Sequence, residues 1–218
     1  MEFTPPGRFK STEQFREHWT SLDPSLGCDL EVEGPDGPLA RPLLVPDRDG
    51  GTRSIGNRFC VHPMEGWDGT EDGGPTENTL RRWRHFGLSG AKLIWGGEAY
   101  AVQPDGRANP NQLHMNPDPA VDNAANLARL LDALKSTHLE HHSTTDDLLV
   151  GLQLTHSGRF SRPHGTTMSP RIAELNPVLS EKYGLDASVH ILTDRELREI
   201  SGNLVKAACL AADVGFDF

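Results

Sequence analysis

The sequence has few cysteines, no long apolar run and no excess of basic residues. The three cysteines, Cys28, Cys60 and Cys209, are scattered and form no Cys-x-x-Cys pair, which argues against a disulfide framework and fits a reducing cytoplasm. No stretch approaches the roughly 20 apolar residues of a membrane span, and the first residues lack the pattern of a signal peptide. The net charge of -10 disfavours binding to nucleic acid or to an anionic membrane. We therefore expect a cytoplasmic protein without a nucleic-acid or membrane partner.

The sequence is rich in glycine and proline, which predicts many loops. Its 218 residues suffice for one good core, whereas a complete eight-unit barrel usually takes about 250 residues. Residues 1–54 contain one predicted helix, at about residues 11–22, and a predicted hairpin in residues 29–45 around a Gly-Pro-Asp-Gly-Pro turn. We interpret residues 1–54 as an N-terminal extension.

From Ile55 onward, short apolar runs alternate with longer amphipathic stretches, a pattern typical of βα units around a parallel sheet. The predicted strands are residues 58–61, 91–95, 148–154 and 214–218. The predicted helices are residues 76–86 with Gly87 as C-cap, residues 118–139 with Asp118 as N-cap, and a third that opens with a capping box of Thr193 and Glu196. All three apolar helix stripes are suited to covering a sheet.

The unusual residues follow the strands rather than the helices. They lie in residues 62–75, 96–112 and 155–190, each of which comes after a predicted strand. Active sites of TIM barrels lie at this edge, and doubly wound sheets share the rule, so periodicity alone leaves both folds open. The first loop is too long for a Rossmann phosphate turn and lacks its Gly-x-Gly-x-x-Gly pattern.

Three segments together resemble the NADH:flavin oxidoreductase, or old yellow enzyme, family. They are Asn-Arg-Phe-Cys-Val-His-Pro-Met at 57–64, Leu-Ile-Trp-Gly-Gly-Glu-Ala-Tyr-Ala-Val with Pro-Asp-Gly-Arg at 93–107, and Gln-Leu-Thr-His-Ser-Gly-Arg at 153–159. The resemblance covers residues 57–218 and is nearest to the branch of dienoyl-CoA reductases and trimethylamine dehydrogenase. It implies an α/β fold in which residues 55–218 are the N-terminal portion, about four strands, of an FMN-binding (β/α)8 TIM barrel.

The resemblance implies an FMN-dependent oxidoreductase that transfers hydride from NADH or NADPH, through the flavin, to an activated alkene or related small molecule. By position, Pro63 and Met64 would lie against the flavin, Ala99 beside its ring, and Gln153 at its pyrimidine edge. A primary amide suits that edge because it offers both a donor and an acceptor, and alanine lets the backbone approach a planar ligand closely.

Two neighbouring residues are the candidates for chemistry and for substrate binding. Glu65 stands where the family commonly has Thr, Ser or Cys, and an ionised carboxylate there would oppose formation of anionic reduced flavin. We interpret Glu65 as a catalytic residue that tunes the flavin potential or handles a proton, with an ordinary loop acid as the alternative. Trp67 is the candidate to cover a flat substrate, and a hydrophobic plug is its alternative.

Other patterns carry less weight. His138, His141 and His142 end a predicted helix without a carboxylate or cysteine to complete a metal set, so we predict no metal site. His156 and Arg159 are interpreted as structural hydrogen-bonding residues. A metal-dependent barrel hydrolase is retained only as a third class of function.

The resemblance places the rest of the active site beyond Phe218. The pair of residues that binds the substrate carbonyl, the phosphate site, and any iron–sulfur ligands or dinucleotide domain would all lie downstream. A half barrel has open sheet edges, so we expect a complementary C-terminal half or an oligomer. The alternative function is a non-catalytic barrel fragment that acts as a structural or regulatory partner.

Overall fold

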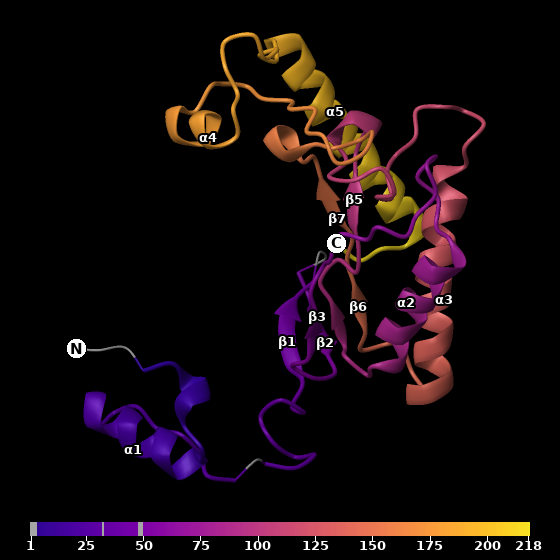
Figure 1. Cartoon of the computed structure of the whole chain (residues 1–218). Coiled ribbons are helices and arrows are strands. Elements are labelled where there is room, and N and C mark those ends of the chain that lie inside the picture. Colours follow the sequence, from indigo (N-terminus) through magenta and orange to yellow (C-terminus); the bar gives the residue numbers. More distant parts are fainter. Residues whose placement is uncertain (1–3, 32, 48–49) are drawn as a thin grey trace. The chain divides into compact units, whose positions relative to one another are not determined.

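A computed structural model describes residues 4–31, 33–47 and 50–218. The chain divides into two compact units, Met1–Arg41 and Pro42–Phe218 (Figure 1). The predicted N-terminal extension is divided by this boundary, because its last residues pair with each other inside the larger unit. Among the described residues, no helix is both long and apolar enough to cross a bilayer.

The smaller unit contains helix α1 (Thr12–Leu22), as the sequence predicts, and before it a short 3-10 turn, η1 (Pro6–Arg8). The helix begins after Ser11, whose hydroxyl accepts a hydrogen bond from the Gln14 N–H at 3.3 Å. The Phe15 and Trp19 rings lie one helical turn apart with centroids at 5.4 Å. The Phe9 ring also contacts Phe15, with centroids at 5.5 Å, so aromatic contacts join the helix to the segment before it.

The predicted hairpin of residues 29–45 is wrong. Its described residues up to Arg41 form turns and bends, with the Gly37 N–H donating to the Gly34 carbonyl at 2.9 Å, and residue 32 lies outside the described part. The prolines of this segment have no N–H for a strand ladder. The hairpin forms later, from the antiparallel strands β1 (Leu43–Pro46) and β2 (Thr52–Ile55).

The larger unit alternates parallel strands and helices, as the sequence predicts. Three strands form a parallel sheet in the order β3-β4-β6, and two more form a parallel pair, β5-β7. The order along the chain is β3 (Cys60–Val61), α2 (Glu77–Leu88), β4 (Leu93–Ile94), β5 (Ala99–Ala101), η2 (Pro104–Gly106), α3 (Asn123–His142), β6 (Leu149–Val150), β7 (Gln153–Thr155), η3 (Gly158–Phe160), α4 (Pro177–Lys182) and α5 (Asp194–Val214).

Two barrel strands are each interrupted near the middle. The second runs as β4 and then β5, and the break contains Gly96 at φ 146° and Gly97 at φ 46°, conformations that favour glycine. The third, predicted as one strand over 148–154, runs as β6 and then β7. Ala99 pairs with Gln153 beyond the interruption, so the parallel register resumes toward the strand ends.

The helices differ from their predictions at the ends. Helix α2 continues through Gly87 to Leu88, and Gly87 instead lies against α3, where an added Cβ would be 2.3 Å from the Leu134 carbonyl oxygen. Asp118 does not cap α3, because its carboxylate accepts from the Ala120 N–H within its own turn. Asp122 is the N-cap, and its carboxylate accepts from the Ala125 N–H at 2.9 Å.

Helix α5 confirms the predicted capping box and then runs longer than expected. The Glu196 N–H donates to the Thr193 hydroxyl and the Thr193 N–H donates to the Glu196 carboxylate, which helps to lower the pKa of Glu196 to about 2. The helix ends at Val214, with Gly215 as a left-handed cap. The predicted fourth strand, residues 214–218, is therefore partly helix, but Asp217 and Phe218 still exchange backbone hydrogen bonds with Val150 and Leu152 beside β6.

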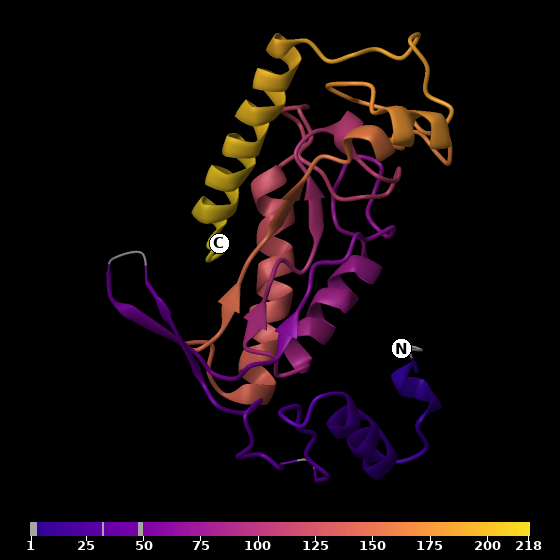
Figure 2. The same ribbon diagram turned by 90° about the vertical axis from the view of Figure 1, so that its left-hand side faces the viewer.

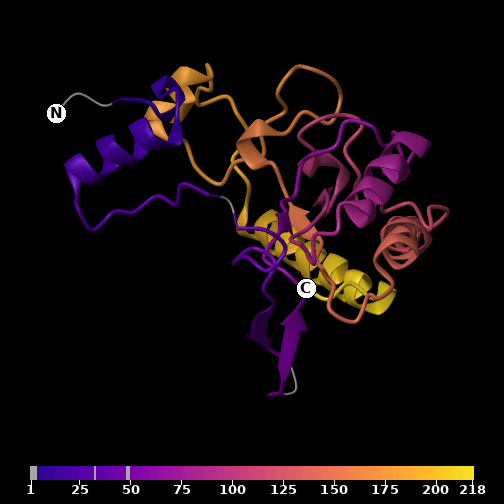
Figure 3. The same cartoon turned by 90° about the horizontal axis from the view of Figure 1, so that it is seen from below.

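The core lies between the strands and the helices α2, α3 and α5. Trp83 of α2, Ile94 of β4 and Leu134 of α3 are fully buried, and the ring of Phe216 contacts Trp83 edge-on at 6.2 Å. The three helices lie around one side of the strands, and the β1–β2 hairpin extends away from them (Figures 2 and 3). This arrangement leaves the carboxyl ends of the parallel strands as the place where the loops meet.

Candidate flavin-facing site

The structure brings the four predicted cofactor-binding residues to the ends of adjacent parallel strands. Met64, just after β3, forms a parallel bridge with Glu98, and Ala99 of β5 pairs directly with Gln153 of β7. Pro63 lies on the same wall, because a Cβ added to Gly96 would be 3.2 Å from the Pro63 Cβ. The same added Cβ would be 3.1 Å from the Gln153 Cβ, so Gly96 lies between the two side chains.

The exposure of these residues fits a wall that faces a ligand. Ala99 is buried in the sheet, whereas Met64 is 68% exposed and Gln153 is also exposed. Among the described residues, the Gln153 side-chain amide makes no hydrogen bond to protein, so its donor and its acceptor are both available. An apolar wall beside such an amide matches the apolar face and polar edge of a flavin ring.

Glu65 and Trp67 lie in the loop after β3, on either side of the buried Gly66. The Glu65 carboxylate is exposed, and its Oε1 accepts a hydrogen bond from the Asn109 side-chain amide at 2.8 Å. The Trp67 indole is 64% exposed, so it does not act as a hydrophobic plug within the described structure. Both side chains are thus exposed on the surface of the loop.

A buried acidic group lies behind this loop. Glu98 is fully buried and forms an ion pair with the Arg82 guanidinium at 2.7 Å, and Arg82 also pairs with Asp68 at 2.8 Å. Burial raises the pKa of Glu98, against the opposing effects of Arg82 and of the Gly66 N–H. The short distance to Arg82 and the two donors favour the ionised carboxylate as the partner in this network.

The loop after β5 is held by two buried polar side chains. The Arg107 guanidinium donates to the carbonyls of Pro104, Pro110 and Pro163 at 2.8, 2.6 and 3.2 Å. The Gln112 amide donates to the Ala99 carbonyl at 2.7 Å, directly beside the predicted flavin contact. Arg107 belongs to one of the family-like segments, but the sequence did not indicate its role. Gln112 was missed, because a lone glutamine in a loop carries no pattern.

The histidines and Arg159 lie in structural contacts. The His156 Nδ1 accepts from the Gly158 N–H at 3.1 Å, and burial lowers the pKa of His156. Arg159 donates to the Ser180 hydroxyl and the Glu174 carbonyl, which confirms its role in anchoring loops. His138 and His142 each place a ring nitrogen near a carbonyl at the end of α2, at 3.0 and 3.1 Å. Within the described residues, no group of three or more metal-ligating side chains is gathered.

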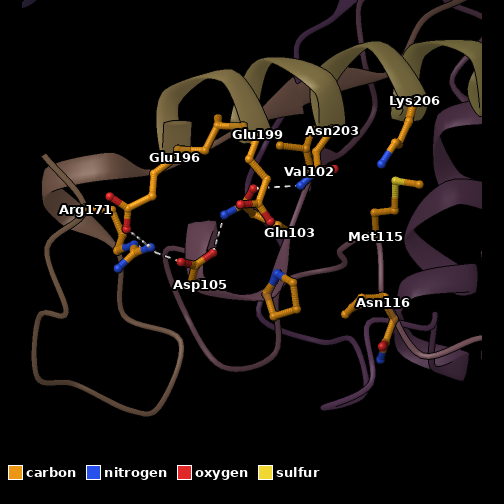
Figure 4. A pocket seen from close by; sticks show the side chains of 13 residues that line it. Val102, Gln103, Asp105, Met115, Asn116, Arg171, Glu196, Glu199, Asn203 and Lys206 are labelled. Carbon is orange, nitrogen blue, oxygen red and sulfur yellow. Dashed lines mark hydrogen bonds and ion pairs between the residues drawn. The ribbon is translucent and has the colours of Figure 1, made fainter. Parts of the chain in front are cut away.

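A polar cavity of about 440 Å³ lies between the end of β5 and helix α5 (Figure 4). Arg171 pairs with Asp105 at 2.8 Å, and the Asn203 amide donates to the side-chain Oε1 of Gln103 at 3.0 Å. Figure 4 shows these groups linking the loop to the helix. The network therefore attaches α5 to the site's supporting loop.

An apolar cavity of about 670 Å³ lies between the β1–β2 hairpin and the inner side of the sheet. Trp95 and Phe218 line it with ring centroids 5.1 Å apart, and they are 54% and 43% exposed. Large exposed apolar side chains therefore gather in one cavity on this side of the sheet.

Comparison with known proteins gives structural similarity only. No family model and no curated protein matches the sequence. Among solved structures, an old yellow enzyme from a Pichia species aligns with a TM-score of 0.61 at 18% identity, over 84% of this chain and 45% of its own. The old yellow enzyme from Trypanosoma cruzi gives 0.58 at 25% identity, over 83% and 49%. Histamine dehydrogenase from a Rhizobium species gives 0.56 at 20% identity, over 82% and 23%.

These alignments define the class of fold. The parallel βα units of this chain are those of the first part of a TIM barrel, and the chain spans about a quarter to a half of the length of the structures it matches. The fold is that of the N-terminal part of the old yellow enzyme family, as the three sequence segments predict.

Proposed function

We propose that this chain supplies the flavin-facing wall of an FMN-dependent oxidoreductase of old yellow enzyme type. The observation that carries the proposal is the convergence of Pro63, Met64, Ala99 and Gln153 at the ends of adjacent parallel strands. The four residues come from three separate segments, and each segment resembles the corresponding segment of that family. When bound, FMN would accept hydride from NADH or NADPH and pass it to an activated alkene or a related small molecule.

The residues present have complementary tasks toward the cofactor. The Gln153 amide would donate to a carbonyl and accept from an N–H at the pyrimidine edge of the ring. Ala99 lets the β5 backbone approach the ring, and the Gln112 bond to the Ala99 carbonyl fixes that backbone in place. Met64 presents an exposed, polarisable side chain that suits contact with a flat aromatic surface.

Glu65 and Trp67 would act on the reaction and on the substrate. A carboxylate near the flavin adds negative charge, which disfavours anionic reduced flavin and lowers the reduction potential. The same carboxylate is a candidate to hold or move a proton at the reacting centre. The Trp67 indole would cover a flat substrate above the ring. Asn109 holds the carboxylate of Glu65 in one orientation.

We further propose that additional βα units complete the barrel, supplied by a complementary C-terminal half or by another copy of the chain. The apolar cavity lined by Trp95 and Phe218 and the open edges of the described sheet support this proposal. The phosphate site and the residues that bind the substrate carbonyl would then come from the added units. The three free cysteines are compatible with a cytoplasmic setting.

Titration with FMN tests the proposal. Quenching of flavin fluorescence is followed with the full chain alone and with the C-terminal half of a related barrel enzyme added. We expect saturable binding of FMN. Gln153→Leu should raise the Kd about tenfold, because it removes about 1.4 kcal/mol of hydrogen bonding to the ring. Gln14→Leu, in the smaller unit, is the matched control and should leave FMN binding unchanged. Absence of binding in both settings would favour the non-catalytic fragment.

A further inference from the structure

The Gly66 peptide, between Glu65 and Trp67, is held from both sides by buried side chains. Its N–H donates to the Glu98 carboxylate at 2.9 Å, and its carbonyl accepts from the Asn109 amide at 3.1 Å. Glu98 and Asn109 are both fully buried, and they come from the strand break before β5 and from the loop after it. Few loop peptides are fixed by two buried groups, because burying such groups is costly unless they are paired.

The Asn109 side chain can face Glu65 in only one way. Its Oδ1 accepts from the Asn111 N–H at 2.9 Å, so its Nδ2 is the atom that donates to the Glu65 carboxylate at 2.8 Å. The same Nδ2 donates to the Gly66 carbonyl. One buried amide therefore fixes both the backbone of the loop and the side chain of its exposed acid.

Glu98 is fixed just as firmly from the opposite side. Arg82 of helix α2 pairs with its carboxylate at 2.7 Å and is itself paired with Asp68, so the loop is connected to the helix. A side chain at residue 66 would force the ion pair to shift, because an added Cβ would be 2.5 Å from the Arg82 Nη2 and 2.9 Å from the Glu98 Oε1. Glycine lets the peptide lie this close to the ion pair without displacing it.

We propose that Glu98 and Asn109 are positioning residues that clamp the Gly66 peptide, and that Asn109 sets the direction of the Glu65 carboxylate at the flavin. The clamp places Glu65 and Trp67 before any ligand binds, so their orientation costs nothing at the moment of reaction. Without it, an exposed glutamate on a loop would sample many rotamers in water. The part that concerns the flavin rests on the proposed function, whereas the clamp itself does not.

Amide hydrogen exchange on the full, isotope-labelled chain tests the clamp without any cofactor. The Gly66 N–H should exchange at least about tenfold more slowly, relative to its intrinsic rate, than that of Gly27, which is exposed and whose N–H donates no hydrogen bond within the described residues. In Glu98→Gln, a neutral amide replaces the carboxylate that pairs with Arg82 and accepts from the Gly66 N–H. This substitution should remove most of the exchange protection of the Gly66 N–H. Asn109→Ala should do so in part. Asn203→Ala, which removes an amide bond at the polar cavity, should not change it.

If Gly66 in the wild-type chain exchanges as fast as Gly27, the clamp is overturned, whether or not the variants fold. Protection that survives both Glu98→Gln and Asn109→Ala overturns it as well. These outcomes do not depend on FMN, so they remain distinct from failure of the proposed function.

The flavin-dependent part is tested by a double-mutant cycle on FMN-loaded protein. Asn109→Ala should shift the midpoint potential of the flavin in the wild-type background, and the shift should vanish in a Glu65→Gln background. A residue that merely stabilises the loop would shift the potential equally in both backgrounds, and that result overturns the positioning role. If the protein binds no FMN, the proposed function fails while the exchange experiment still decides the clamp.

Discussion

Single side chains decide what the loop after β3 does. The Glu65 carboxylate is exposed but tied to Asn109, whereas Gly66 beside it is buried and tied to Glu98. The chemistry of the exposed residue thus depends on buried partners from other segments of the chain. An acid in this place is the main departure of this sequence from the family pattern that it resembles.

Glu65→Gln should raise the midpoint potential of bound FMN. The glutamine oxygen can still accept from Asn109, so the substitution removes the charge and keeps the shape. Removing one negative charge several ångströms from the ring, at an effective dielectric constant of about 20, should raise the midpoint potential of this two-electron couple by about 30–60 mV. Spectroelectrochemical titration measures the shift. Glu13→Gln, in the smaller unit, is the control, and an unchanged potential would make Glu65 an ordinary loop acid.

His114 should make the fold less stable as the pH falls. Burial, assisted by the charge of Arg107, lowers the pKa of His114 from its usual 6.5 to about 4. Between these values the unfolded chain binds a proton that the folded chain does not, so stability is complete above pH 6.5 and is lost toward pH 4. The loss is roughly 1–3 kcal/mol.

Urea unfolding of the wild type and of His114→Gln at several pH values between 7.5 and 4.5 checks this effect, at about the precision of linear extrapolation. The free energy of unfolding of His114→Gln should fall less steeply with decreasing pH than that of the wild type. His164→Gln, at an exposed position, should show the same pH dependence as the wild type. An equal pH dependence of the free energy of unfolding for His114→Gln and the wild type would show that His114 has the same pKa in the folded and unfolded chain.

At the scale of elements, glycine serves different purposes in different helices. In α2, Gly87 lets the helix approach α3 closely, because an added Cβ would be 2.3 Å from the Leu134 carbonyl oxygen. In α5, Gly202 has no atom within 4 Å of an added Cβ. The sequence alone gives both residues the same low helix propensity.

Gly87→Ala and Gly202→Ala should therefore change stability in opposite directions. The first should destabilise the fold by about 1–3 kcal/mol, because α2 must move away from α3. The second should stabilise it by about 0.5–1 kcal/mol, through helix propensity alone. Urea unfolding of the two variants provides the measurement and makes each the control for the other. Changes of the same sign would contradict the close packing of α2 on α3.

At the scale of the larger unit, the sheet presents an apolar cavity rather than a finished barrel interior. Trp95, Phe218 and the hairpin residue Leu43 line this cavity, and each is more than a third exposed. Arg53 of the hairpin pairs with Asp217 at 2.6 Å, so the hairpin is connected to the segment beside β6. The cavity is therefore bounded by the hairpin on one side and by the sheet with its neighbouring C-terminal segment on the other.

Trp95→Glu should reduce binding of the apolar dye ANS and self-association of the chain. We expect the wild type to bind the dye and the variant to lose roughly half of the fluorescence gain, because a charge would lie in the cavity. Val205→Glu, at an exposed position of α5, is the matched control. Sedimentation velocity over a range of concentrations provides the second measurement. Equal dye binding by the wild type and Trp95→Glu would show that this cavity does not bind the dye.

Local sequence determined those features that short-range physics controls. The capping box of α5 and the Ser11 cap of α1 were predictable because a side chain and a nearby N–H suffice to form them. The alternation of strands and helices followed from the spacing of apolar residues, and the family-like segments indicated which strand ends would carry the site. The hairpin was misplaced because two turn signals lie close together in the sequence, Gly-Pro-Asp-Gly-Pro at 34–38 and Asp-Gly-Gly at 49–51, and their local patterns do not decide which one joins two paired strands.

Only the tertiary structure decided how the site is supported. Asn109, Glu98 and Gln112 hold residues distant from them in the sequence, and nothing in their local pattern predicts which carbonyl or carboxylate each will meet. Such contacts depend on register across parallel strands and on the packing of α2 behind them, and both are long-range properties. The sequence determined which residues lie at the ends of the strands, and the fold determined what holds them there.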